Sequence, residues 1–187
     1  MFGDVRGCRV VLVAHCLLNQ NSIVPGLARF SAVAPGVVEL LSGYGLGIFQ
    51  LPCPETLSHG LMRWWMTREQ YDNPGYRSLC RKLCKLVAYY ALEYTRCGVE
   101  VVGLVGIAGS PSCGVNTTST GWTGGEPAVK EKSRRVKGRG VFTEILLETL
   151  RKHGIKLKFT VEYDYNKPEE SLKTIEQEIK RKLKTQK

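Results

Sequence analysis

Four short apolar runs stand out along the chain and predict β-strands. Residues 99–107 are nearly all apolar or β-branched, as expected of a strand that is buried on both faces of a parallel sheet. Residues 9–14 and 46–51 have the same character. Residues 155–163 instead alternate apolar and polar side chains, which predicts a half-exposed strand at a sheet edge.

Apolar residues at helical spacing occupy the segments between these runs. They predict a long helix over 74–97, a short one between Pro35 and Gly43, a third over 142–152 and a last one over 168–187 that carries a basic tail. Alternating strands and helices predict an α/β fold. We expect a single-domain, open, mainly parallel sheet of about four or five strands flanked by helices, Rossmann-like in layout, over residues 1–187.

Each of the first three predicted strands runs into a cysteine: Cys16, Cys53 and Cys113. In an open α/β sheet, ligands bind beyond the carboxyl ends of the strands. If the three strands are parallel neighbours, the three thiols converge there. A free cysteine is often only a small buried hydrophobe, but the shared position at strand ends favours a bound metal group.

Three converging thiols suit a zinc ion or an iron-sulfur cluster. Structural zinc needs four closed ligands, and catalytic zinc usually adds His or a carboxylate. His15 is not expected to be that ligand, because adjacent residues leaving a strand point to opposite sides. Thiolates also hold iron-sulfur clusters, and three of them on a cubane leave one iron open. The residues by themselves leave both groups open.

Four motifs follow one another along the chain: His15-Cys16-Leu17-Leu18-Asn19, Leu51-Pro52-Cys53-Pro54-Glu55, Ser110-Pro111-Ser112-Cys113-Gly114 and Gly138-Arg139-Gly140-Val141-Phe142. Together they resemble the thiouracil desulfurase family. The resemblance implies a [4Fe-4S] cluster held by Cys16, Cys53 and Cys113. Its fourth iron would take the sulfur of a thiolated nucleobase and release it as sulfide. The resemblance also implies an acid/base role for Glu55 and a supporting hydroxyl at Ser110.

The similarity runs from about Val10 to Tyr163 and includes two departures. Residues 21–26 replace the Arg-Tyr-Asp-Gly of the family after the first cysteine, and residues 59–65 replace its Pro-Arg stretch. These departures bear on the identity of the substrate more than on the cluster.

Candidate substrate contacts are His15, Asn19, Ser112 and Trp64. Asn19 lies in a polar segment that equally suits a turn. Trp64 belongs to an aromatic-rich stretch that could stack on a flat heterocycle, cap the core or form an oligomer interface. The catalytic candidates also have structural alternatives. The Ser110 hydroxyl could only stabilise a turn, and Glu55 could only be an acid in the first turn of a helix.

Cys80 and Cys84 lie four residues apart on the long predicted helix, beside Leu83 and Val87. Their spacing places them on one helix face, where they could pack in the core or bind a second metal. The apolar neighbours favour core packing.

Residues 114–139 have little periodicity and are rich in Thr, Gly and charged residues. A segment of this length in a compact domain is usually functional or disordered, and we expect a long loop that covers the site. The chain carries a net charge of +10, and six basic residues of this loop fall in one short window: Lys130, Lys132, Arg134, Arg135, Lys137 and Arg139. They could draw a phosphate-bearing thionucleotide or RNA to the site, or form only a solvated surface.

Seven cysteines, an odd number, argue against a disulfide framework, and no apolar run is long enough to span a bilayer. We therefore expect a cytoplasmic protein whose thiols stay reduced. Two functions remain in view. One is a cluster-dependent desulfidase acting on a thionucleobase, and the other is a non-enzymatic metal-binding or RNA-binding module. No RRM, KH or zinc-finger motif supports dedicated RNA recognition.

Overall fold

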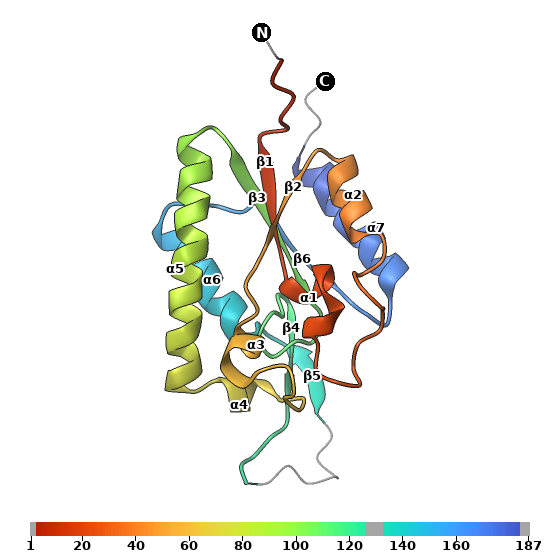
Figure 1. Cartoon of the computed structure of the whole chain (residues 1–187), viewed down its shortest axis with the longest axis vertical. Helices are drawn as coiled ribbons and strands as arrows, with labels where there is room; N and C mark the ends of the chain where they lie inside the picture. The colour runs from red at the N-terminus through yellow and green to blue at the C-terminus, as the bar shows by residue number, and fades with distance from the viewer. Residues whose placement is uncertain (1–2, 126–132, 184–187) are drawn as a thin grey trace.

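Four parallel strands form the sheet at the centre of the molecule (Figure 1). A computed structural model describes residues 3–125 and 133–183. The strands are β1 (Arg9–Val13), β2 (Gly47–Gln50), β3 (Glu100–Ile107) and β6 (Phe159–Tyr163), and their order in the sheet is β2-β1-β3-β6. The predicted parallel sheet is confirmed, and β6 lies at its edge as its alternating pattern indicated.

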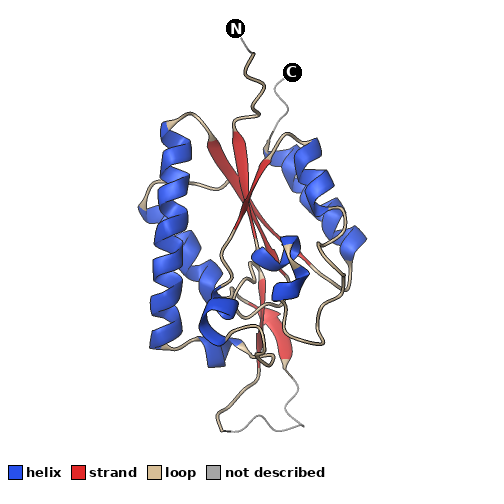
Figure 2. Cartoon of the chain, viewed as in Figure 1, coloured by secondary structure: helices blue, strands red, loops and turns tan. Residues whose placement is uncertain are grey.

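Helices cover both faces of this sheet (Figure 2). One face carries α5 (Pro74–Arg96) and α6 (Val141–Lys152), and the other carries α2 (Val37–Gly43) and α7 (Pro168–Lys182). Side chains alternate along each strand, so neighbouring residues of β1 enter different cores. Leu12 packs with α5 and α6, whereas Val11 and Val13 pack with α2 and α7. The two apolar cores hold the sheet in the middle layer.

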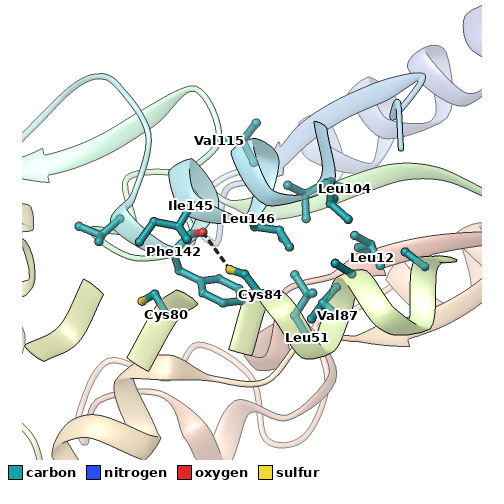
Figure 3. Packing of buried hydrophobic residues seen from close by; sticks show 14 of the residues in the cluster. Leu12, Leu51, Cys80, Cys84, Val87, Leu104, Val115, Phe142, Ile145 and Leu146 are labelled. Atoms are coloured by element: carbon teal, nitrogen blue, oxygen red, sulfur yellow. Dashed lines mark hydrogen bonds between the residues drawn. The ribbon is translucent and has the colours of Figure 1, made fainter. Parts of the chain in front are cut away.

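Helix α5 carries Cys80 and Cys84. Asn73 caps the helix by accepting a hydrogen bond from the Tyr76 N–H at 3.0 Å, and Pro74 occupies the first turn. Cys80 and Cys84 are both 0% exposed. Figure 3 shows the Cys84 sulfur directed at Phe142 of α6. The Cys84 thiol meets the Phe142 carbonyl at 3.9 Å. Both thiols therefore pack in the core, as their apolar neighbours predicted.

Short helices follow the strands at the opposite end of the sheet from the chain termini. They are α1 (His15–Leu18), the 3-10 turn η1 (Gln20–Ser22), α3 (Pro54–His59) and α4 (Arg68–Tyr71). The sequence pattern did not predict α1 or η1, which form as soon as β1 ends. None of the described helices has the length and apolar character needed to cross a membrane.

A small antiparallel hairpin occupies much of the segment 114–139, which we expected to be a loop. Its strands are β4 (Thr117–Thr120) and β5 (Arg134–Lys137), paired in register from Thr117↔Lys137 to Thr120↔Arg134. One strand is made of Thr and Ser and the other mostly of basic residues, so no apolar alternation revealed them. Lys130 and Lys132 lie outside the described residues, as do Lys184 and Lys187 of the basic tail.

Candidate metal centre and substrate cavity

A cavity of about 310 Å³ opens beyond the carboxyl ends of β1, β2 and β3. Cys16, Cys53 and Cys113 all line it, together with Glu55 and Ser110. The five residues lie on three segments that are far apart in sequence, and the parallel sheet brings those segments together. This is the position that open α/β sheets use for ligands.

Each cysteine is placed by a local turn at its strand end. Cys16 is the second residue of α1, and Cys53 is the N-terminal cap of α3. The Cys53 sulfur accepts hydrogen bonds from Thr56, at 3.4 Å from the backbone N–H and 3.3 Å from the hydroxyl. The backbone N–H of Cys113 donates to the Ser110 hydroxyl oxygen at 2.9 Å. Local hydrogen bonds therefore hold the Cys53 sulfur and the backbone of Cys113 in place.

Burial makes the Cys16 and Cys113 thiols hard to ionise in the absence of a cation. It raises the pKa of the Cys16 thiol to about 12, and it raises the pKa of Cys113 well above its ordinary value. Negative charge on Cys16 or Cys53 raises the pKa of Cys113 further. A cationic group among the three sulfurs would stabilise all three thiolates together.

The donor set fits an iron-sulfur cluster. Three thiols from three strand ends border one cavity, and clusters are held by thiolates in this way. Among residues 3–125 and 133–183, no three His, Cys, Asp or Glu side chains come close enough to share a single metal ion.

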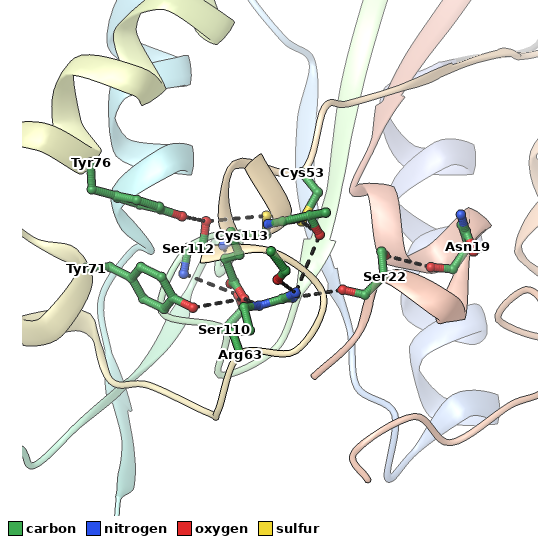
Figure 4. Close-up of polar contacts among 12 residues, drawn as sticks. Asn19, Ser22, Cys53, Arg63, Tyr71, Tyr76, Ser110, Ser112 and Cys113 are labelled. Carbon is green, nitrogen blue, oxygen red and sulfur yellow. Dashed lines mark hydrogen bonds and ion pairs between the residues drawn. The ribbon is translucent and has the colours of Figure 1, made fainter. Parts of the chain in front are cut away.

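The Glu55 carboxylate is held by two neighbours at the cavity wall. Arg63 donates from Nε at 3.2 Å and Tyr71 from its hydroxyl at 3.3 Å. Burial raises the pKa of Glu55, while the charge of Arg63 and the two hydrogen bonds oppose that rise. Arg63 is only 6% exposed and also donates to the carbonyl of Ser22 at 2.8 Å (Figure 4). The carboxylate therefore has a fixed orientation beside the thiols.

Ser110 combines the two roles that its position suggested. Its hydroxyl oxygen accepts the N–H groups of Ser112 at 3.3 Å and of Cys113 at 2.9 Å, so it shapes the turn that carries the third thiol. The same residue lines the cavity. Its hydroxyl proton has no acceptor within the described part of the chain.

His15 lines the cavity beside Cys16. We expected the two to point to opposite sides, and this is wrong because β1 ends at Val13 and the chain is helical from His15. The Nδ1 atom of His15 lies 3.2 Å from the Leu51 carbonyl oxygen. The ring is thereby tied to the segment that leads into Cys53.

The structure does not place the other three candidate contacts at the cavity. The Asn19 side chain accepts from the Asn21 N–H at 3.1 Å and caps η1. Ser112 is fully buried, with its hydroxyl 2.7 Å from that of Tyr76 (Figure 4). Trp64 is 59% exposed, whereas the neighbouring Trp65 lines the cavity.

Several cavity residues were absent from the sequence-based candidates: Arg29, Arg63, Tyr71 and Tyr165. Arg63 and Tyr71 lie in or near the stretch that departs from the family pattern, and that departure was the available signal. Arg135, which the basic window did include, also lines the cavity. Tyr165 follows β6 in the sequence, where nothing in the pattern indicated a site.

Glu162 of β6 anchors the chain just after Cys113. Its Oε1 accepts the backbone N–H groups of Val115, Asn116 and Thr117 at 2.6, 2.7 and 2.8 Å. Its Oε2 accepts the Thr117 hydroxyl at 2.9 Å. One carboxylate thus joins the edge strand to the start of the hairpin.

Comparisons with known proteins place this arrangement in context. Residues 8–130 match the family described as "Putative 2-thiouracil desulfurase". The protein MJ0003 of Methanocaldococcus jannaschii is 35% identical over 181 residues, which cover 94% of this chain and 100% of that protein. A solved structure, the [4Fe-4S]-dependent thiouracil desulfidase TudS, aligns at 20% identity with a TM-score of 0.49, over 89% of this chain and 97% of that one.

Proposed function

The chain belongs to the 2-thiouracil desulfurase family, and on that basis we propose that it is a [4Fe-4S]-dependent desulfidase. It would remove sulfur from a thiolated nucleobase or a related thioamide and release sulfide. The observation that carries the proposal is the set of three strand-end thiols around one cavity, with the Glu55 carboxylate held beside them.

Cys16, Cys53 and Cys113 would hold the cluster. When bound, the cluster supplies a Lewis-acidic iron that accepts the sulfur of the substrate. The cavity walls include Trp65, Met66 and Ile107, which offer an apolar surface to a flat heterocycle. These side chains exclude bulk water and orient the ring.

The reaction that we propose is a hydrolysis without net oxidation or reduction. Water adds to the ring carbon that carries sulfur, the carbon–sulfur bond breaks with its electron pair on sulfur, and a carbonyl remains. The water must lose a proton as it adds. Glu55 accepts that proton, because Arg63 favours its ionised form and Tyr71 helps to fix its orientation. The Ser110 hydroxyl orients the water or the substrate.

The direct test is sulfide release under anaerobic conditions. The reconstituted protein is incubated with 2-thiouracil, 4-thiouracil and the matching thiouridine monophosphates, and sulfide and the oxo product are measured together. We expect equimolar sulfide and oxo product from at least one substrate, and neither from Cys113→Ser. A cluster-loaded protein that releases no sulfide from any of them would contradict the proposal.

A further inference from the structure

The hydroxyl of Tyr165 has no role in the proposed reaction. The residue lies two positions beyond the end of β6 and lines the same cavity as Cys16. Its ring packs edge-on against Phe30, with centroids 6.0 Å apart, and against Tyr163 at 5.8 Å. Two aromatic contacts therefore fix the direction in which the hydroxyl points.

The Tyr165 hydroxyl is closed off from solvent and makes no hydrogen bond to any described residue. Buried O–H groups in native proteins are nearly always hydrogen-bonded, because an unmade bond is costly. The hydroxyl lies within interaction range of the Cys16 sulfur and the Gln20 side chain. The Cys16 sulfur is therefore a candidate acceptor for this hydroxyl.

Both polar atoms of the Gln20 side-chain amide already have hydrogen-bond partners. Its amide nitrogen donates to the Cys16 carbonyl at 2.7 Å, and its amide oxygen accepts from the Arg29 N–H at 3.3 Å. These contacts favour the Cys16 sulfur as the acceptor of the Tyr165 hydroxyl.

The Cys16 sulfur becomes a stronger acceptor when it ligates a cluster. A neutral thiol is a weak acceptor, whereas a thiolate accepts strongly. Metal ligation requires the thiolate. We propose that Tyr165 donates a hydrogen bond to the Cys16 thiolate in the cluster-loaded protein, and that it is a positioning residue which strengthens this ligand. The inference rests on the proposed function.

Two measurable consequences follow from this bond. Hydrogen bonds to the sulfurs of a cluster help to set its reduction potential, and removing a donor makes reduction less favourable. Partners of metal ligands also contribute about 10- to 100-fold to metal affinity or activity. Loss of the hydroxyl should therefore lower the potential and speed the loss of iron.

The test compares Tyr165→Phe with Tyr163→Phe in reconstituted holoprotein. Both variants remove one hydroxyl from neighbouring rings, but the Tyr163 hydroxyl donates to the Pro35 carbonyl at 3.4 Å, and the residue does not line the cavity. We expect Tyr165→Phe to bind iron but lose it to a chelator about 10- to 100-fold faster, with a more negative midpoint potential. Tyr163→Phe should match the wild type in both measurements.

Equal potentials and equal rates of iron loss in the two variants would overturn the inference. If Tyr165→Phe does not fold, replacing Tyr165 with 3-fluorotyrosine supplies a stronger donor. The potential must then rise, and an unchanged potential would overturn the inference. A wild-type protein without a cluster would overturn the proposed function and this inference together, whereas a loaded wild type with an unaffected Tyr165→Phe would overturn the inference alone.

Discussion

The cysteines of the cavity and those of α5 share a residue type but lie in opposite surroundings. Cys80 and Cys84 are one helical turn apart, fully buried, and packed among apolar side chains of α5 and α6. Cys16, Cys53 and Cys113 are widely separated in sequence, partly exposed, and border a common cavity with Glu55. Burial raises the pKa of Cys80 to about 12, as it does for Cys16, so ionisation alone does not distinguish these two thiols.

The difference teaches that topology, not local spacing, assembles this site. A helix places Cys80 and Cys84 close together and leaves them inside a core, where they fill space. The parallel sheet brings three distant thiols to one edge, where loops and short helices leave room for a ligand. Variants in the two regions should therefore affect different properties.

The largest effect is expected for the cavity cysteines. Cys16→Ser, Cys53→Ser and Cys113→Ser should each lose most or all of the iron and acid-labile sulfide, because each removes a thiolate ligand. Cys80→Ala and Cys84→Ala should keep the wild-type content. Iron and sulfide are measured in both sets of variants after anaerobic purification. Comparable losses at Cys80 or Cys84 would contradict the difference between the cavity cysteines and the core cysteines.

Next in size is the effect of removing the proposed base. Glu55→Gln should keep its iron and lose about 10²- to 10⁴-fold in turnover, as general-base removal typically does. Glu39→Gln is the matched control, since Glu39 is also a first-turn acid but is exposed on α2. Near-normal sulfide release by a fully loaded Glu55→Gln would show that the proton goes elsewhere, and His15 would be the next candidate.

A variant in the apolar core should lose stability but keep its iron. Leu146 is 0% exposed and packs in the same core as Cys84. Leu146→Ala should lower the free energy of unfolding by about 2–5 kcal/mol, because it leaves a cavity. Denaturant titration measures this change. The iron content per folded chain should remain that of the wild type, and a selective loss of iron would mean that the two regions are coupled.

Glu162 tests the polar contacts that hold the cavity edge. Glu162→Gln replaces a carboxylate that accepts four hydrogen bonds, so we expect about 1.5–3 kcal/mol less stability. Unlike Leu146→Ala, it should also weaken iron retention, because the anchored segment begins two residues after Cys113. Chelator challenge alongside denaturant titration separates the two effects; a variant that loses stability but retains iron normally would count against a link to the site.

The smallest effect is expected for the basic residues of the hairpin. Neutralising Arg134, Lys137 and Arg139 should raise KM for a thionucleotide more than for a free thiobase, with kcat little changed. Exposed charges act mainly by attraction, so added salt should shrink the difference. An equal change for both substrates at every salt concentration would show that these charges do not recognise phosphate.

The strands and long helices were predictable because their patterns reflect burial. The run 99–107 is apolar on both faces because β3 lies inside a covered sheet, and its end at a cysteine indicated the site. The hairpin strands were not predictable in this way, since neither contributes an apolar face to the two cores. The turn at His15 was also missed, because the side from which a chain leaves a strand depends on its backbone path.

The chemistry of the site was less predictable than its location. Arg63 is buried against Glu55, yet an isolated arginine in a variable segment reads as a surface residue. The choice between Trp64 and Trp65 depends on the path of an irregular stretch, which has no period to fix it. Tyr165 and Glu162 act across the sheet, so only the strand order brings them to Cys16 and Cys113.

The metal content of the wild-type protein tests the central claim most directly. Iron, zinc and acid-labile sulfide are counted per chain after anaerobic purification and reconstitution, with Mössbauer spectroscopy to identify the cluster. We expect about four iron and four sulfide per chain and no stoichiometric zinc, as a [4Fe-4S] cluster on three cysteines requires. Zinc near one per chain with no iron would contradict the account and favour a non-enzymatic metal-binding protein.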